Sequence, residues 1–96
     1  MELNLNIESV IFGESIPETN TGKILSVALM HVENTDGFTA KKLEGWAGKL
    51  RKGEPLTLDE ADRGLLKQFI DSPNLSIKPF IRNQINSLID ELGKLQ

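Results

Sequence analysis

The sequence predicts an α+β domain that is mostly helical, with an N-terminal strand or short hairpin followed by about four helices. Apolar and polar residues alternate strictly from Glu2 to Glu8, which is the period of a half-buried strand. Residues 39–70 have the pattern of two amphipathic helices joined by a turn, a central helical hairpin. Residues 81–95 carry apolar side chains at helical spacing. A chain of 96 residues has room for one such core, so we expect a single domain over residues 1–96.

The first predicted strand places Leu3, Leu5 and Ile7 on one face. A strand is not stable alone, so it needs a mate from the same segment or an edge from another subunit. Gly13 breaks the apolar run, and Ile16-Pro17 is either a short second strand or an extended return.

Residues 24–32 form an apolar run that fits two structures. Their β-branched content suits a central strand. Ile24, Ala28 and Val32 instead recur at helical spacing, and Asn20 or Thr21 would cap such a helix. We favour the helix.

Turn residues divide the central helical hairpin. Gly53 and Pro55 end its first helix. The sequence Thr57-Leu58-Asp59-Glu60 then has the form of a capping box, which makes Thr57 the predicted N-cap of the second helix.

The last predicted helix has Ser76 as its N-cap and Pro79 in its first turn. Its apolar stripe repeats closer to 3.5 than to 3.6 residues per turn, with Phe80 and Ile89 beside it. Two heptads are too few to predict a coiled coil. The stripe therefore packs on the core of its own domain or receives a partner helix; it consists of Ile81, Ile85, Leu88, Leu92 and Leu95.

Composition gives an expected location. The chain has no cysteine, which excludes disulfides and thiolate metal sites and fits a reducing compartment. It shows no secretory signal and no apolar run near the ~20 residues that span a bilayer. We expect a cytoplasmic protein with no membrane contact.

Motifs for catalysis are absent, including GxxxxGK[ST], GxGxxG, HExxH and GxSxG. His31 is the only histidine, and we interpret it as a residue at the edge of a helix. Asp59, Glu60 and Asp62 stand where a helix begins, and anions there complement the helix dipole. We expect no catalytic residue, no metal site and no cofactor, and therefore no enzyme.

Residues 38–53 hold five cations against Glu44, in a chain whose net charge is −3. The cations Lys49, Arg51 and Lys52 suit the last turn of a helix, or they form a patch for phosphate or an acidic partner.

The helical hairpin also resembles a helix-turn-helix in outline. Its connection is longer than usual, and its second helix opens with acidic residues that would repel phosphate. DNA binding is therefore possible but disfavoured.

Trp46 is the only tryptophan and stands between Gly45 and Gly48. Each glycine inside a helix costs roughly 1 kcal/mol relative to alanine, and close approach of another backbone would explain it. Trp46 either packs in the core or anchors a partner.

A set of short motifs spans residues 22–92: Gly22-Lys23, Trp46-Ala47-x-Lys49-Leu50, Gly53-Glu54-x-Leu56-x-Leu58, Asp62 and Leu66-Lys67-x-Phe69-Ile70. This set resembles small uncharacterised proteins encoded by phages and prophages. The resemblance implies a strand followed by a helix at the start of the chain. The loop between Phe12 and Thr21 is shorter here, which leaves a second strand open. No activity is attached to that group, so no site residue is carried over.

We therefore expect a non-catalytic accessory protein of the phage or prophage type, located in the host cytoplasm if it is phage-encoded. It would act by binding another protein or a second copy of itself. The alternative is a DNA-associated or regulatory protein that uses the basic helix 39–52. The candidate partner-binding residues are Trp46, Lys49, Arg51, Lys52, Ile85, Leu88 and Leu92.

Overall fold

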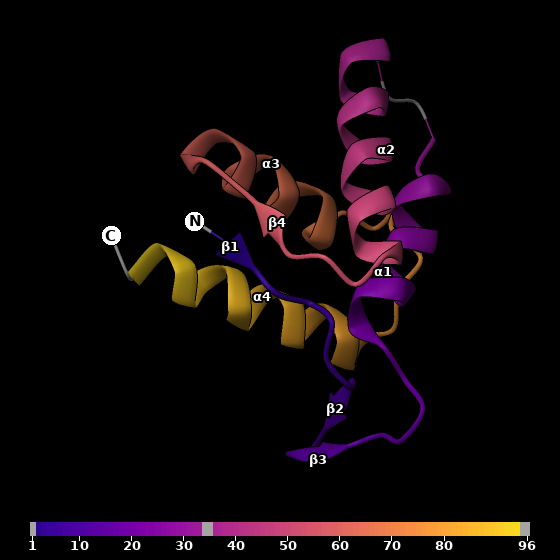
Figure 1. The fold of residues 1–96 in the computed structure, drawn as a ribbon, viewed down its shortest axis with the longest axis vertical. Coiled ribbons are helices and arrows are strands. Elements are labelled where there is room, and N and C mark those ends of the chain that lie inside the picture. The colour runs from indigo at the N-terminus through magenta and orange to yellow at the C-terminus, as the bar shows by residue number, and fades with distance from the viewer. Residues whose placement is uncertain (1, 34–35, 95–96) are drawn as a thin grey trace.

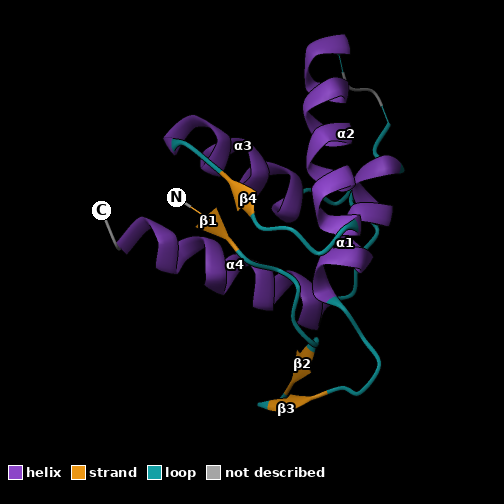
Figure 2. Cartoon of the chain, viewed as in Figure 1, coloured by secondary structure: helices purple, strands orange, loops and turns teal. Residues whose placement is uncertain are grey.

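The computed structural model describes residues 2–33 and 36–94, and its four helices and four two-residue strands confirm the α+β, mostly helical class (Figures 1 and 2). The helices are α1 (Thr21–Met30), α2 (Gly37–Arg51), α3 (Glu60–Asp71) and α4 (Pro79–Lys94). The strands are β1 (Glu2–Leu3), β2 (Val10–Ile11), β3 (Glu14–Ser15) and β4 (Leu56–Thr57). They form two antiparallel pairs, β1 with β4 and β2 with β3.

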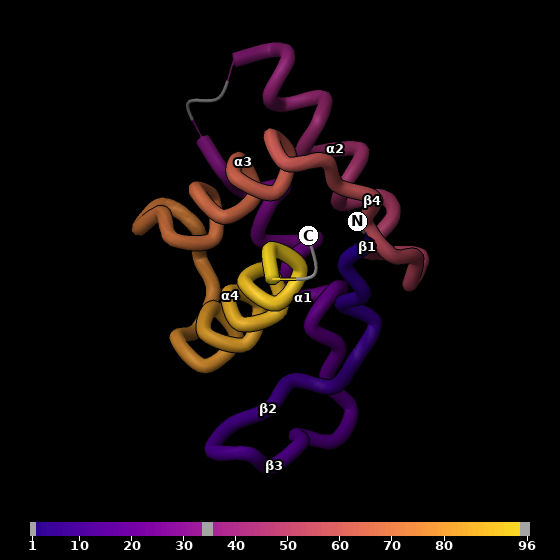
Figure 3. Tube along the Cα trace, turned by 90° about the vertical axis from the view of Figure 1, so that its left-hand side faces the viewer, coloured from indigo at the N-terminus to yellow at the C-terminus, as the bar shows by residue number. Residues whose placement is uncertain are grey.

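The strand predicted over residues 2–8 covers only Glu2–Leu3, and its pairing was predicted wrongly, because its partner β4 belongs neither to the N-terminal segment nor to another subunit. Leu3 pairs with Leu56 and Glu2 with Thr57, so β1 lies against the connection between α2 and α3 (Figures 1 and 3). Beyond β1 the chain continues to the start of α1, where the Leu5 carbonyl accepts from the Gly22 amide at 2.7 Å. A Cβ on Gly22 would stand 3.1 Å from that carbonyl oxygen, so the close approach favours glycine. The N-terminal segment thus contacts the connection between α2 and α3 through β1, and the first turn of α1 through Leu5.

The predicted second N-terminal strand exists, but at Glu14–Ser15 and not at Ile16-Pro17. Ile11 pairs with Glu14, which leaves Phe12-Gly13 as a two-residue turn. Both turn residues have positive φ, +50° for Phe12 and +81° for Gly13. This is the backbone of a hairpin turn whose twist matches its flanking strands.

The ambiguous run 24–32 is mainly helix α1, as favoured from its spacing. The Asn20 side chain caps it by accepting from the Lys23 amide at 2.9 Å. Leu25, Ala28 and Leu29 are buried, and α1 packs along α2 (Figure 1). A helix explains this burial because those residues share one face.

The predicted start of the α3 helix was wrong. Thr57 belongs to β4, and its pairing with Glu2 keeps its backbone extended. The N-cap is Asp59, whose side chain accepts from the Asp62 amide at 2.7 Å. The strand pair moves the helix start two residues downstream.

The predicted cap of α4 was also wrong, because the helix begins at Pro79 and not directly after Ser76. The Lys78 carbonyl accepts the first helical bonds, from the Ile81 and Arg82 amides at 3.1 Å each. Proline disfavours helical backbone in the residue before it, so the helix does not extend upstream through Lys78. Pro79 occupies the first helical position, where its missing N–H costs nothing.

We expect Asp59→Ala to lower the free energy of unfolding by about 1 kcal/mol, because it removes the α3 cap. Asp59→Asn keeps a capping oxygen and serves as the control. Urea unfolding monitored by circular dichroism measures both. An Asp59→Ala midpoint equal to that of wild type would show that another group caps α3.

All four helices contribute to one core together with β1 and β4. Trp46 from α2 belongs to it with only 7% of its surface exposed, as one of the two sequence interpretations proposed. From α4, Ile85 and Ile89 are wholly buried. The other core side chains are Leu3, Leu5, Leu25, Ala28, Leu29, Leu43, Leu50, Leu56, Leu58, Leu66, Ile70, Leu75 and Ile81.

Candidate functional site

The tip of the β2–β3 hairpin carries a fully exposed aromatic side chain. Phe12 is 99% exposed and its neighbour Ile11 is 37% exposed. Phe12 also holds a left-handed backbone, which costs roughly 1–2 kcal/mol for a residue with a side chain. Both its exposure and its backbone conformation are therefore unfavourable in the isolated chain. Such a combination is typical of residues kept for function.

The hairpin is fixed to α4 by one side chain. Gln84 accepts from the Val10 amide at 3.0 Å through Oε1 and donates to the Glu8 carbonyl at 3.1 Å through Nε2. These bonds place the hairpin below α4 in Figure 2. An apolar groove lies between them, which we call the hairpin groove; its lining includes Val10, Ile11, Phe12, Phe80, Gln84 and Leu88.

The candidate residues of α4 occupy different environments. Ile85 is 0% exposed and offers no surface to a partner in this fold. Leu88 and Leu92 are half-buried and pack against the core, and Leu88 also lines the hairpin groove. Leu95 lies outside the described residues. Of the stripe, Leu88 is the residue that the structure brings next to the exposed hairpin.

The candidate cations of α2 are all exposed. Lys49, Arg51 and Lys52 occupy the last turn and C-cap of the helix, as the sequence predicted. Arg51 lines a second groove, between α1 and α2. Apart from the neighbouring residues and backbone of α2 itself, no described residue comes within 4 Å of a Cβ added at Gly45 or Gly48. The described residues therefore do not make the close backbone approach expected at these glycines.

Lys42 is half-buried and ion-paired although it belongs to the basic segment. Its ammonium forms an ion pair with Asp62 of α3 and lies 5.6 Å from the centroid of the Phe38 ring and 6.0 Å from that of Trp46. This pairing joins α2 to α3. It also neutralises one of the cations that nucleic acid would contact.

The acidic residues at the start of α3 have structural partners. Asp59 caps the helix and Asp62 pairs with Lys42. A hydrogen bond from Arg63, at 2.6 Å, lowers the pKa of Glu60. These contacts agree with the interpretation of the three acids as part of the helix start.

His31 lies exposed at the end of α1, where its Nδ1 is 2.8 Å from the Val27 carbonyl oxygen. Within residues 2–33 and 36–94, no three histidine or acidic side chains gather to hold a metal ion. Over the same ranges, no helix combines the length and apolar character that crossing a membrane requires.

Comparisons with known protein families, characterised proteins and solved structures gave no match. The site is therefore interpreted from its own geometry. The exposed hairpin tip is not among the sequence predictions, because Gly13 is interpreted there only as the end of an apolar run. The Phe12-Gly13 pair between two extended dipeptides was the available signal, since glycine there favours a two-residue turn.

Proposed function

We propose that this chain is a non-catalytic accessory protein that acts by binding another protein through its hairpin tip. The observation that carries the proposal is the fully exposed Phe12 side chain on a left-handed backbone. Phe12, Ile11 and Leu88 lie along one apolar groove, which extends the contact beyond a single residue. The phage or prophage type of accessory protein remains part of this proposal through the sequence resemblance alone.

Energetics favour a binding role for Phe12. Burial of a phenylalanine against a partner contributes about 1.5–3 kcal/mol. The left-handed backbone of Phe12 costs roughly 1–2 kcal/mol. In the unbound chain the exposed Phe12 side chain makes no contact that compensates for this cost. Contact with a partner therefore offsets the cost, and aromatic side chains are frequent at the centres of such contacts.

The alternative of a DNA-associated protein has less support. Lys42 is paired with Asp62, and the exposed cations Lys49, Arg51 and Lys52 occupy a single turn at the end of α2. Strong binding to phosphate needs a larger positive face.

We expect Phe12→Asn to stabilise the protein by about 1 kcal/mol and to abolish partner binding. Asparagine tolerates the left-handed backbone and, followed by Gly13, is the preferred residue of this turn. Urea unfolding measures the stability. Binding is measured by affinity purification from the cells that make the protein, with the retained proteins identified by mass spectrometry.

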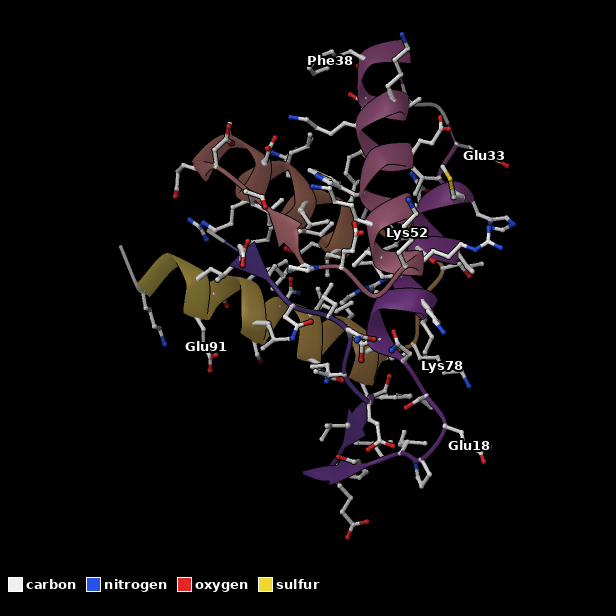
Figure 4. All side chains as sticks on the ribbon, viewed as in Figure 1. Glu18, Glu33, Phe38, Lys52, Lys78 and Glu91 are labelled. Carbon is white, nitrogen blue, oxygen red and sulfur yellow. The ribbon has the colours of Figure 1, made fainter. Side chains whose placement is uncertain are left out.

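The matched control is Phe38→Ala, because Phe38 is also exposed (76%) but lies in α2, where Figure 4 shows it projecting at the far end from the hairpin. A protein retained by wild type and Phe38→Ala but lost by Phe12→Asn supports the proposal. Equal retention by all three chains contradicts it.

A further inference from the structure

The groove between α1 and α2, which we call the α1–α2 groove, combines apolar and cationic side chains. Val27 is 60% exposed and Met30 is 51% exposed, so α1 presents two large apolar residues to solvent. The cations Lys23 and Arg51 also line the groove, against one acid, Glu44. The remaining lining residues are Ser26, His31, Ala47 and Gly48.

Gly48 leaves room in the lining of this groove. Apart from the neighbouring residues and backbone of α2 itself, a Cβ at this position would have no atom of residues 2–33 and 36–94 within 4 Å, so the packing of these residues does not use that space. A flat aromatic ring from outside would fit against a glycine more closely than against a longer side chain.

The hairpin has the opposite charge. Residues 8–18 contain Glu8, Glu14 and Glu18 and no lysine or arginine, and all three acids are exposed. Phe12 and Ile11 stand between them at the tip. The chain therefore carries an acidic apolar protrusion and an apolar groove with basic residues, which are complementary in both charge and hydrophobicity.

These two surfaces have no residue in common. The α1–α2 groove is lined by α1 and by the C-terminal half of α2, whereas the β2–β3 hairpin lies below α4 in Figure 1 and lines a different groove. Gln84 fixes the hairpin to α4, so a chain in this fold does not insert the tip into its own groove. The complementary surfaces can meet only between copies.

We propose that the partner of the hairpin tip is a second copy of this chain, whose α1–α2 groove receives Phe12. This inference rests on the proposed function, since it uses the same binding residue. Because the two contacting surfaces differ, a pair of copies joined by one contact still has one free hairpin, on one copy, and one free groove, on the other. The contact therefore repeats head to tail and builds a ring or an open chain of copies.

Sedimentation velocity over a series of protein concentrations tests this proposal. We expect wild type to form species larger than a dimer, and added salt to weaken them because the contact pairs acidic with basic residues. Phe12→Asn removes the tip and Val27→Glu blocks the groove. Each variant alone should associate more weakly than wild type by more than about tenfold.

Mixing the two variants gives the sharpest result. The Val27→Glu chain still has a tip and the Phe12→Asn chain still has a groove, so the mixture should form a one-to-one dimer that does not grow further. Val27 is exposed, which makes its replacement compatible with folding, and circular dichroism checks this. Met30→Glu provides a second block of the same groove, and Phe38→Ala should assemble like wild type.

Two results would overturn the inference: a wild type that stays monomeric at every concentration, or groove variants that assemble like wild type. If wild type is monomeric while Phe12 is still required to retain a different protein, the second-copy inference fails and the proposed function stands. If Phe12→Asn assembles like wild type and also retains the same proteins, both fail.

Discussion

Replacing Ile85 by alanine is expected to lower the free energy of unfolding by about 2–5 kcal/mol. Ile85 is wholly buried in α4, and the truncation leaves a cavity among side chains that relax only partly. Native domains have a stability of roughly 5–15 kcal/mol, so this loss is a large fraction of the total. Urea unfolding followed by circular dichroism and by Trp46 fluorescence measures it.

Leu88→Ala is the matched control because Leu88 is one turn away and only half-buried. Its loss should be clearly smaller than that of Ile85→Ala. If the two losses were equal, α4 would present a different face to the core than the structure shows.

Leu56→Ala is expected to cause a loss of similar size, about 2–5 kcal/mol. Leu56 is fully buried and pairs with Leu3, so its side chain packs where the N-terminal strand meets the connection between α2 and α3. The cavity would loosen β1 as well as the core. Hydrogen exchange of the paired strands, together with urea unfolding, would detect both effects.

Thr57→Ala is the control within the same strand, since Thr57 is exposed and does not cap α3. We expect a change of less than about 0.5 kcal/mol, the usual range for surface substitutions. A large loss for Thr57→Ala with an unchanged Leu56→Ala would contradict the observed strand register.

The hairpin tip shows why part of the site was not predicted from the sequence. Phe12 continues an apolar run, and composition alone interprets such a residue as buried strand. Its exposure depends on the turn at Phe12-Gly13 and on two hydrogen bonds between the hairpin segment and Gln84, one accepted and one donated by its side chain, which lies more than seventy residues away along the chain. The cations of α2 were predicted correctly as helix-end residues because that assignment depends only on neighbouring sequence.

The sequence by itself determined which segments are helical. Apolar spacing located the helices, and Asn20 was one of the two caps proposed for α1, because these signals act within one or two turns. The caps predicted for α3 and α4 were wrong. Only the tertiary structure decided which residues those elements meet. Leu3 pairs with Leu56, which lies in a distant segment. In α4, Ile81, Ile85 and Ile89 are buried, whereas Leu88 and Leu92 are half-buried. The physical reason is that a periodic stripe limits which face turns inward, while its exact rotation depends on the shapes of distant segments packed against it.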